Sequence, residues 1–436
     1  MNRSHFNTES NPLGLSGREL DEDRPSSGSA APSRPTKLDR WLASLLAERF
    51  DTSRVRIALW DDARDSGPGA LPVTVRFGDR GALYQALSNP AANFGDLYSA
   101  GRITVHGDLL VVLDEAYNSA NKHPQLSGLM ARVRAKTPSL ADSRRNIHHH
   151  YDIGNEFYRL WLDRDALQYT CAYYADEAMS LEQAQQAKMH HVCRKLRLEP
   201  GERVVEAGCG WGGFAIFMAR NYGVRVRSFN ISREQIAWAR DWAKAEGQDG
   251  QIEFVEDDYR NMSGRYDVFV SVGMLEHVGT GNYRQLGALA GRVLTSEGRG
   301  LVHSIGRDRP LPLNPWIERR IFPGAYPPTL REMMDIFEPN RFSVLDVENL
   351  RLHYAKTLEH WLQRYDQHVD AIEEMMDAAF VRAWRLYLAG SIAAFTIGEL
   401  QLFQVVFTRA NNNQLPWSRA YLYREEVTTG GKHEAG

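Results

Sequence analysis

The sequence has few cysteines, no long apolar run and no marked excess of either charge. Its three cysteines, Cys171, Cys193 and Cys209, are too few for a disulfide framework, so we expect a reducing compartment. The chain contains no run of about 18 apolar residues, the length that a membrane-spanning helix needs, and residues 1–10 lack the apolar core of a secretory signal. The 52 basic and 55 acidic residues give a net charge of −3, so no overall positive field favours nucleic acid. These absences predict a cytoplasmic protein without a nucleic-acid partner.

What is present is the composition of a folded globular protein, with 43% hydrophobic, 10% aromatic and 25% charged residues. At 436 residues the chain is too long for one domain of ordinary size, so we expect two. Changes in composition predict a disordered tail rich in serine and proline (1–36), a small α+β domain (37–120), a basic linker (121–147), a larger α/β domain (148–410) and a C-terminal tail (411–436).

The segment 121–147 carries six basic residues against one acidic residue, Asp142. Apolar residues at helical spacing lie in the same segment: Leu126, Leu129, Met130 and Val133. A helix here would be basic on one face and apolar on the other, and such a helix can lie on an anionic membrane surface. The alternative is a connector that docks on the core and keeps its charges in solvent.

Strands and helices alternate in the pattern after residue 148, which is typical of a parallel α/β sheet. The pattern predicts strands over 203–207, 224–229, 252–255, 266–272 and 300–305. It predicts helices over 212–220, 232–245 and 283–294, and a mostly helical stretch over 329–398. We expect an apolar strand over 401–407 to complete the sheet.

A glycine-rich turn, GCGWGG (208–213), directly follows the strand over 203–207. Glycines suit a turn that a ligand must approach closely. A dinucleotide site of this kind expects an acidic residue at the end of the second strand, but that strand ends FNIS (229–232). The acid Glu206 before the glycines instead fits S-adenosylmethionine, whose carboxylate would face the N-terminus of the next helix. A glycine-rich turn without a ligand is the alternative.

A second landmark, SVGMLEHVG (271–279), places Glu276 and His277 at the carboxyl end of a later strand. In open α/β sheets, ligands bind in the crevice beyond these strand ends. We therefore expect both side chains in the ligand pocket. The alternative is structural, with Glu276 as a favourable acid at a helix N-terminus.

Further motifs extend over residues 120–410. They are HYDIGN (150–155), QYTCAYY (168–174), EQAQQAK (182–188), DYR (258–260), HSIG (303–306), PWI…IFPG (315–324) and QLFQVVFTR (401–409). Together with the two landmarks, they resemble the cyclopropane-fatty-acyl-phospholipid synthases, which are related to the mycolic acid cyclopropane synthases. The resemblance implies a class I S-adenosylmethionine-dependent methyltransferase fold, with a Rossmann-like seven-stranded sheet and helical insertions that bind an acyl chain.

The resemblance also implies the residues of two adjoining sites. S-adenosylmethionine would contact Tyr169, Thr170, Glu206, Gly208, Gly210, Gly212, Asn230, Ser232, Gln235, Asp258 and Tyr259. Bicarbonate, the catalytic base of the family, would be held by Cys171, Glu276, His303, Ile305 and Tyr354, with the cysteine and the isoleucine acting through backbone groups. No metal is expected.

The implied reaction explains why such residues are needed. An alkene takes the methyl group from sulfur and becomes a carbocation, so water must be excluded and a proton must leave the transferred methyl group for a ring to close. A small anion oriented by Glu276, His303 and Tyr354 can take that proton. Aromatic side chains that could face the cation are Tyr169, Tyr173, Tyr174 and Trp211. Core packing is the alternative role for these aromatics.

The chain departs from the family pattern at three positions. Glu206 stands where aspartate is common, Asn230 where threonine is common, and Ser391 where the family usually carries a cysteine. The alkene chemistry requires no cysteine nucleophile, so the departure at Ser391 does not argue against activity.

An unsaturated phospholipid substrate, peripheral association with an anionic membrane surface on its cytoplasmic side, and a homodimer are further implications of the resemblance. The apolar side chains over 329–398 are numerous enough to enclose an acyl chain. Two alternatives stay open. One is a fatty-acyl methyltransferase that leaves a methylene or methyl branch, and the other is a methyltransferase for a soluble small molecule, which would need no basic membrane-facing segment.

Overall fold

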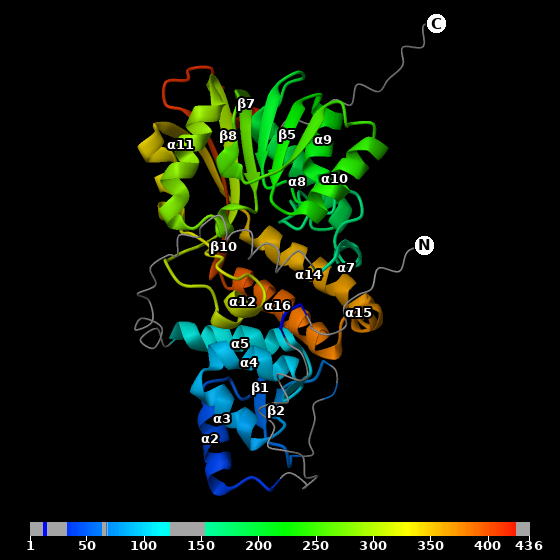
Figure 1. Ribbon diagram of the computed structural model, residues 1–436. Coiled ribbons are helices and arrows are strands. Elements are labelled where there is room, and N and C mark those ends of the chain that lie inside the picture. The colour runs from blue at the N-terminus through cyan, green and yellow to red at the C-terminus, as the bar shows by residue number, and fades with distance from the viewer. Residues whose placement is uncertain (1–11, 15–32, 63–66, 68, 123–152, 424–436) are drawn as a thin grey trace, which may run out of the picture.

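The computed structural model describes residues 12–14, 33–62, 67, 69–122 and 153–423. In these residues, a three-stranded and a seven-stranded sheet lie at opposite ends of the molecule, with helices between them (Figure 1). The larger sheet belongs to the C-terminal part of the chain. An α/β fold with a small N-terminal α+β unit is therefore confirmed, whereas the boundaries between domains stay a prediction.

The described part of the N-terminal unit consists of short strands and helices. Its strands are β1 (Val55–Ala58), β2 (Val73–Phe77) and β3 (Ile103–His106), with β2 parallel to β1 and antiparallel to β3. Its helices are α2 (Lys37–Ala47), α3 (Arg80–Ser88), α4 (Pro90–Ser99) and α5 (Leu109–Lys122). Thr36 and Asp39 cap α2 reciprocally, each side chain accepting a backbone N–H at the start of the helix.

The larger sheet has the strand order β6-β5-β4-β7-β8-β10-β9. Its strands are β4 (Arg203–Ala207), β5 (Arg225–Asn230), β6 (Ile252–Glu256), β7 (Tyr266–Val272), β8 (Leu294–Arg307), β9 (Phe342–Asn349) and β10 (Leu400–Arg409). β4 to β8 are parallel, whereas β10 runs antiparallel to its neighbours β8 and β9. The predicted seven-stranded sheet is thus confirmed, and it is mixed rather than parallel throughout.

The expectation that 329–398 is mostly helical was wrong for the edge strand β9. In this strand Val344 and Val347 are exposed, whereas Asp346 is buried. The usual strand pattern, with apolar residues inward and polar residues outward, is therefore reversed, and the hydrophobic pattern gave no strand signal.

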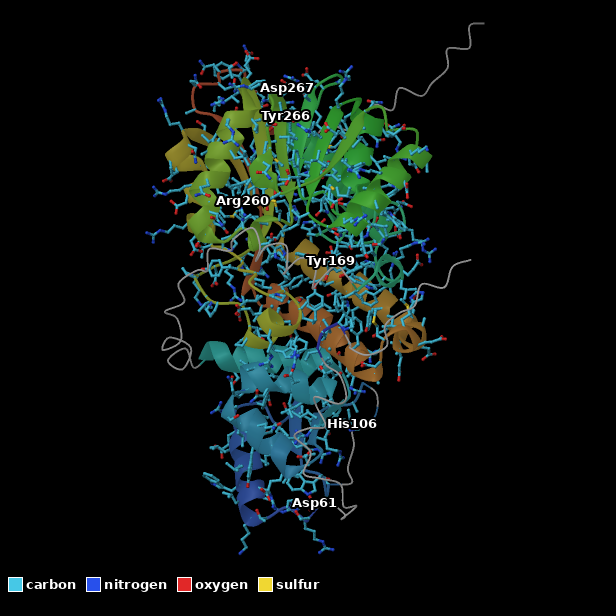
Figure 2. The ribbon with its side chains drawn as sticks, in the orientation of Figure 1. Asp61, His106, Tyr169, Arg260, Tyr266 and Asp267 are labelled. Carbon is cyan, nitrogen blue, oxygen red and sulfur yellow. The ribbon has the colours of Figure 1, made fainter. Side chains whose placement is uncertain are left out.

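Alternate residues of the parallel strands point to opposite faces of the sheet. Val204 and Val268 pack in the same core as α8 (Leu181–Leu196), α9 (Gly213–Tyr222) and α10 (Arg233–Ala245). Val205 and Phe269 pack on the other face with α11 (Tyr283–Val293) and α13 (Leu330–Phe337). Tyr266 and Asp267, at the start of β7, lie at the outer end of the molecule (Figure 2), so the carboxyl ends of the parallel strands face its middle.

The middle of the molecule is helical and rich in aromatic side chains. Its helices are α7 (Asn155–Arg159), α12 (Pro315–Arg320), α14 (Arg351–Gln367), α15 (Val369–Met375) and α16 (Ala378–Thr396). α4 and α5 of the N-terminal unit pack against α16. Asp96 on α4 accepts hydrogen bonds from Arg319 at 2.7 Å and from the indole of Trp316 at 2.9 Å, both on α12. These contacts fix the N-terminal unit beneath the larger sheet.

None of the helices in the described ranges has the length and apolar content needed to cross a bilayer. Of the predicted basic linker, all but its first two residues lie outside the described residues, and so does most of the predicted N-terminal tail. Within that tail, however, Leu13 is buried in the central core, and Arg320 donates hydrogen bonds to the carbonyl oxygens of Leu13 and Gly14.

Candidate active site

The glycine-rich turn joins β4 to α9 at the carboxyl edge of the sheet. Gly208, Gly210 and Gly212 have φ angles of 87°, 52° and 87°, a region that side chains rarely adopt. A Cβ atom at Gly212 would also lie 2.7 Å from the Cβ of Ala239. Glycine is therefore required by the backbone, and the turn leaves the N-terminus of α9 open to an anionic group.

Glu206, the acid before this turn, is buried against Ser228 on the neighbouring strand β5. The Ser228 hydroxyl donates a short hydrogen bond to its carboxylate. Burial raises the pKa of Glu206 to about 7, although the hydrogen bond and the charge of Lys188 act in the opposite direction. Glu206 can therefore hold a proton or a charge at neutral pH.

Asn230, Ser232 and Gln235 form a hydrogen-bonded group where β5 ends and α10 begins. The Asn230 amide donates to the side-chain oxygen of Gln235 at 2.8 Å and to the carbonyl oxygen of Gly210 at 3.3 Å. Ser232 caps α10 by accepting the N–H of Gln235. The Nε2 atom of Gln235 is buried without a partner among the described residues, so a donor is left for a ligand beside the glycine-rich turn.

Asp258 and Tyr259 follow β6, the next strand in the sheet. The Asp258 carboxylate is buried and accepts the backbone N–H of Arg260 at 2.9 Å, which starts a short 3-10 helix over Tyr259–Asn261. β4, β5 and β6 are parallel neighbours, so their carboxyl ends bring Glu206, Asn230 and Asp258 to one edge of the sheet. The structure thus brings together those residues predicted for S-adenosylmethionine that lie at the ends of these three strands.

A buried polar network behind Tyr169 and Thr170 was missed by the sequence analysis. Lys188 is 1% exposed, and its ammonium donates to the Thr170 hydroxyl at 3.1 Å and closely contacts the side-chain oxygen of Gln168. Gln185 donates to the carbonyl oxygen of Thr170 at 2.8 Å. Burial lowers the pKa of Lys188 to about 8, against nearby acidic groups. The available signal was polar residues at core spacing on α8, where Gln185 and Lys188 share a face with buried Leu181.

Glu276 lies after β7, on a short 3-10 helix over Leu275–His277. Its Oε1 atom accepts the backbone N–H of Ile305 at 2.6 Å, and its Oε2 atom is buried without a partner among the described residues. Burial raises the pKa of Glu276 to about 7. The neighbouring His277, which we also expected in the pocket, contacts the ring of Phe322, and burial lowers its pKa to about 4.

His303 lies on β8, two residues before Ile305, so both side chains point to the same face of the sheet. Gln404 on the paired strand β10 donates to the Nδ1 atom of His303 at 3.1 Å. Burial lowers the pKa of His303 to about 3, so the ring is neutral at physiological pH. With Nδ1 as acceptor, the proton of the neutral ring is on Nε2, which can donate to a ligand.

Cys171 and Tyr354 meet at the carbonyl group of Leu350. The Leu350 oxygen accepts the backbone N–H of Tyr354 at 3.1 Å and lies 3.8 Å from the sulfur of Cys171. The N–H of Leu350 donates to the carbonyl oxygen of Leu402 on β10, and Leu402 pairs with Ile305. These bonds connect the five residues predicted for bicarbonate through one strand. Burial raises the pKa of the Cys171 thiol well above its usual range, so the thiol is not a nucleophile.

Ser391 lies on α16, one turn from Tyr387 and one turn from Phe395. The Tyr387 hydroxyl is hydrogen-bonded to that of Tyr169 at 2.9 Å, and Phe395 packs on the ring of Tyr354. Tyr169 lies between the sheet and the middle helices (Figure 2). The structure therefore places Ser391 on the face of α16 that borders both predicted sites.

Closely packed aromatic rings surround Tyr169. Ring centroids 5.0–6.3 Å apart connect Tyr158, Trp161, Tyr169, Trp211, Trp361 and Trp384. Tyr173 and Tyr174, which we also considered as cation-facing aromatics, stack on histidines instead. Their role in facing a cation has no support from these contacts.

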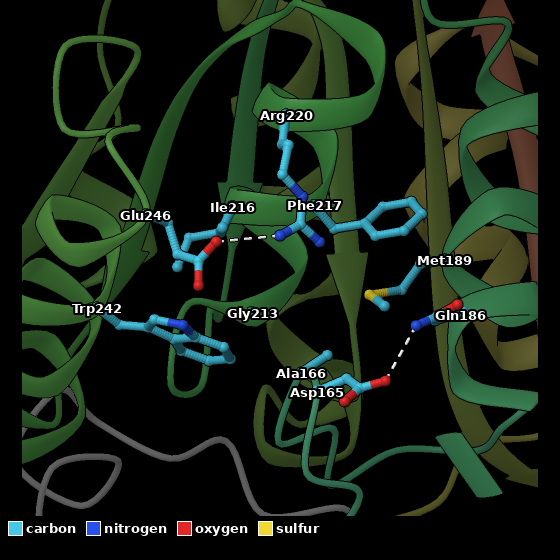
Figure 3. Close-up of a pocket in the computed structure, with 10 residues that line it drawn as sticks. All are labelled: Asp165, Ala166, Gln186, Met189, Gly213, Ile216, Phe217, Arg220, Trp242 and Glu246. Atoms are coloured by element: carbon cyan, nitrogen blue, oxygen red, sulfur yellow. Dashed lines mark hydrogen bonds and ion pairs between the residues drawn. The ribbon is translucent and has the colours of Figure 1, made fainter. Parts of the chain in front are cut away.

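A small pocket of about 30 Å³ lies between α8, α9 and α10 (Figure 3). The ion pair of Arg220 with Glu246 and the hydrogen bond of Gln186 with Asp165 border it, at 3.1 Å and 3.0 Å. This volume holds little more than water. None of the residues predicted for the cofactor lines this pocket, and only Gly213, the residue after the glycine-rich turn's Gly212, belongs to its wall. The pocket is therefore not the cofactor site.

The family model described as mycolic acid cyclopropane synthetase matches residues 139–405. The chain belongs to this family. It is 34% identical over 389 residues to a probable fatty acid methyltransferase of Pseudomonas putida, a match that covers 85% of this chain and 96% of that protein. It is 41% identical over 271 residues to the cyclopropane-fatty-acyl-phospholipid synthase of Escherichia coli (strain K12), covering 62% of this chain and 69% of that protein.

Solved structures agree with this assignment. The cyclopropane synthase MmaA2 of Mycobacterium tuberculosis is 28% identical with a TM-score of 0.58, and the match covers 62% of this chain and 98% of that one. The mycolic acid cyclopropane synthase CmaA1, solved with SAH and CTAB, gives the same identity and TM-score over 61% of this chain and 97% of that one. The predicted family and class I methyltransferase fold are confirmed, and the protein is an S-adenosylmethionine-dependent methyltransferase of this family.

Proposed function

We propose that the protein transfers a one-carbon unit from S-adenosylmethionine to the cis double bond of an unsaturated phospholipid acyl chain and closes a cyclopropane ring, with bicarbonate as the base. The observation that carries the proposal is the buried Oε2 atom of Glu276, which has no partner among the described residues, while Oε1 of the same carboxylate accepts the Ile305 N–H. His303, two residues before Ile305 on β8, is neutral. Fatty acyl chains and phospholipids are named in the relatives from Pseudomonas putida and Escherichia coli.

The residues at the carboxyl ends of β4, β5 and β6 fit S-adenosylmethionine, which supplies a methyl group bound to a positive sulfur. A Cβ atom at Gly210 would meet nothing within 4 Å, so the turn has open space there, and the Nε2 of Gln235, which has no partner among the described residues, offers a buried donor. Glu206, Asn230 and Asp258 would orient the nucleoside and amino-acid parts of the molecule. Thr170, held by Lys188 and Gln185, and Tyr169, whose hydroxyl is bonded to that of Tyr387, would cover it from the side of the middle helices.

The groups around Glu276 fit a small anion that carries one hydroxyl group. An ionised Glu276 can accept the hydroxyl hydrogen of bicarbonate at Oε2, and His303 can donate from Nε2 without adding a charge. Burial raises the pKa of Glu276 to about 7, so the ionised carboxylate that this hydrogen bond requires is present at neutral pH and increases as the pH rises. Cys171 and Tyr354 would complete the site from the other side of Leu350.

Exclusion of water from the acyl chain is supported by the aromatic rings around Tyr169 and by the buried side chains of α16. A carbocation on the chain would face ring surfaces, which attract positive charge and cannot act as nucleophiles in the way that water does. Each ring also contributes apolar surface that suits an acyl chain.

The second candidate is a fatty-acyl methyltransferase that leaves a methyl or methylene branch, which the name of the Pseudomonas putida relative favours. A ring and a methylene branch both add one CH₂ group to the alkene, so mass alone does not separate them, whereas a saturated methyl branch adds CH₄ and needs an external reductant. Lipids from cells that express the protein should therefore be analysed by mass spectrometry before and after catalytic hydrogenation. A ring resists mild hydrogenation and a methylene group does not, and unchanged lipids would contradict both candidates.

We also propose that the basic segment 121–147 places the enzyme on an anionic membrane surface in the cytoplasm, as its charge and apolar spacing support. Replacement of Arg132, Arg134 and Lys136 by glutamine should weaken sedimentation with anionic vesicles and leave activity on detergent-dispersed lipid unchanged. Equal sedimentation of both proteins would return the segment to the role of a connector. The homodimer stays a prediction.

A further inference from the structure

The segment that follows Cys171 is held by three successive backbone N–H groups. Ala172 donates to the hydroxyl oxygen of Thr357 at 3.0 Å, and Tyr173 donates to the carbonyl oxygen of Ala184 at 3.0 Å. Tyr174 donates to the Nδ1 atom of His353, also at 3.0 Å. Two of the three acceptors are side chains of α14, the helix that carries Tyr354.

Stacked rings keep His353 in this position. The Tyr173 ring lies between the rings of His191 and His353, with centroids 4.2 Å and 5.0 Å away and planes inclined by 13° in both pairs. Tyr174 in turn stacks on His360, at 5.7 Å and 9°. The stack leaves His353 little freedom to rotate away from the Tyr174 N–H.

His353 and Thr357 are also hydrogen-bonded to each other, since the Thr357 hydroxyl donates to the His353 carbonyl oxygen at 2.7 Å. Tyr354 is the next residue along α14. The two side-chain acceptors therefore set the position of residues 171–174 relative to Tyr354, although neither His353 nor Thr357 belongs to the site that the sequence predicted.

We propose that His353 is a positioning residue of the methyltransferase, whose neutral Nδ1 accepts the Tyr174 N–H and thereby fixes Thr170 and Cys171 relative to Tyr354. The inference rests on the proposed function in one respect, the assignment of Cys171 and Tyr354 to the base site. Its effect on cofactor binding, through Thr170, does not depend on the lipid product.

Protonation reverses the role of Nδ1, because imidazolium has donors on both nitrogens and offers no acceptor to a backbone N–H. Burial lowers the pKa of His353, and Glu348 acts in the opposite direction. The titratable and charged groups around the ring are His191 and Lys195 on α8, Asp346 and Glu348 on β9, Tyr173 and Tyr174 in the held segment, and Lys356 and His360 on α14. Below its pKa, His353 should release the segment.

Three variants separate this role from simple packing. His353→Asn keeps a hydrogen-bond acceptor, the side-chain carbonyl oxygen, which does not titrate. His353→Leu keeps much of the side-chain volume but removes the acceptor. His360→Leu is the matched control, because His360 stacks on Tyr174 from the same helix and accepts no hydrogen bond from the segment in the structure described. Near-ultraviolet circular dichroism checks that each variant is folded.

Binding of S-adenosylhomocysteine is the first measurement, by calorimetry from about pH 8 down to about pH 4, a range that extends below the usual histidine pKa because burial lowers that of His353. At the upper pH we expect His353→Asn within about 3-fold of wild type and His353→Leu weaker by about 10-fold, the effect of one lost buried acceptor. As the pH falls, wild type and His360→Leu should lose about 10-fold more affinity than His353→Asn. The same pH dependence in His353→Asn and wild type would overturn the proposal, as would unchanged affinity in His353→Leu.

Methyl transfer to lipid is the second measurement. A wild-type protein that binds S-adenosylhomocysteine but leaves unsaturated phospholipid unmodified would contradict the proposed function, and the binding data would still decide the role of His353. If His353→Leu fails to fold, the comparison of His353→Asn with wild type across pH decides alone.

Discussion

Substitution of Glu276 by glutamine tests the proposed base site most directly. Glutamine has nearly the same volume, and its Oε1 atom can still accept the Ile305 N–H, which lies 2.6 Å from the carboxylate oxygen in the wild type. What is lost is the acceptor at Oε2, the buried atom without a partner in the described structure. An amide nitrogen at that place donates, so it opposes the hydroxyl group of bicarbonate instead of accepting from it.

The expected loss is that of one hydrogen bond to a charged, buried acceptor, about 1.5–3 kcal/mol, or about 10- to 150-fold in kcat/KM for bicarbonate. Affinity for S-adenosylhomocysteine should stay within about 2-fold of wild type, because a side chain of the base site is expected to act on the reacting groups and to add little to ground-state binding of the cofactor product. The pH dependence should change as well. The Glu276 pKa of about 7 predicts that wild-type activity falls as the pH drops below neutral, and this limb should be absent in Glu276→Gln.

The assay is the release of S-adenosylhomocysteine in the presence of unsaturated phospholipid vesicles, in degassed buffer to which bicarbonate is added. The concentration of the bicarbonate ion is held constant at each pH, since bicarbonate itself titrates. Glu338→Gln, an exposed carboxylate at the end of α13, is the matched control. Wild-type kcat/KM for bicarbonate in Glu276→Gln would refute the assignment of the base site.

Three further substitutions test separate parts of the structure. In Gly213→Ala the new Cβ would lie 2.0 Å from the carbonyl oxygen of Ala166, so we expect the free energy of unfolding to fall by about 2 kcal/mol or more. The control Gly390→Ala has open space around its Cβ and should change the free energy of unfolding by less than about 1 kcal/mol. Equal effects of the two substitutions in urea denaturation would contradict this expectation. Burial raises the pKa of Glu206 from 4.5 to about 7, so the stability that its protonated form provides is complete below pH 4.5 and is lost as the pH rises through about 7. Glu206→Gln should therefore gain stability relative to wild type as the pH rises over that interval, by up to about 3 kcal/mol, and a constant difference would be the contrary result. Asp96→Asn weakens the bonds from α4 to α12 and should lower the thermal stability of the N-terminal unit by about 1–3 kcal/mol; an unchanged melting profile would show that this joint is held by packing instead.

The parallel part of the sheet could be predicted from the sequence because its signals are local. β4 and β7 have the predicted bounds, since each is a short buried apolar run between turn residues. The glycine-rich turn is equally local, because its positive φ angles depend on three glycines within five residues. The residues at the strand ends then come together by topology alone, which is why predicted cofactor residues from three strands share one edge of the sheet.

The features that the sequence did not predict depend on distant contacts. β9 has exposed valines and a buried aspartate, Asp346, which lies 3.2 Å from the ammonium of Lys195 on α8, and no pattern within eight residues reveals this pairing. Lys188 is buried because Gln168 and Thr170 lie around its ammonium. His353 acts on Tyr174, which lies 179 positions earlier in the chain. Periodicity identifies the buried face of an element, but not the partner that makes a polar side chain stable on that face.

The antiparallel strand β10 explains why the proposed base site needs a mixed sheet. On one side β10 pairs with β8, where Gln404 donates to His303 and fixes which ring nitrogen carries the proton. In the same strand the carbonyl oxygen of Leu402 accepts the N–H of Leu350. The carbonyl oxygen of Leu350 in turn accepts the backbone N–H of Tyr354 and contacts the sulfur of Cys171. A loop could supply these groups, but it could not hold them in register over a few ångströms as a paired strand does. β10 is therefore the element that relates the half of the site on the parallel strands to the half on α14, and the apolar sequence that predicted a strand closing the sheet also encodes the geometry of the proposed base site.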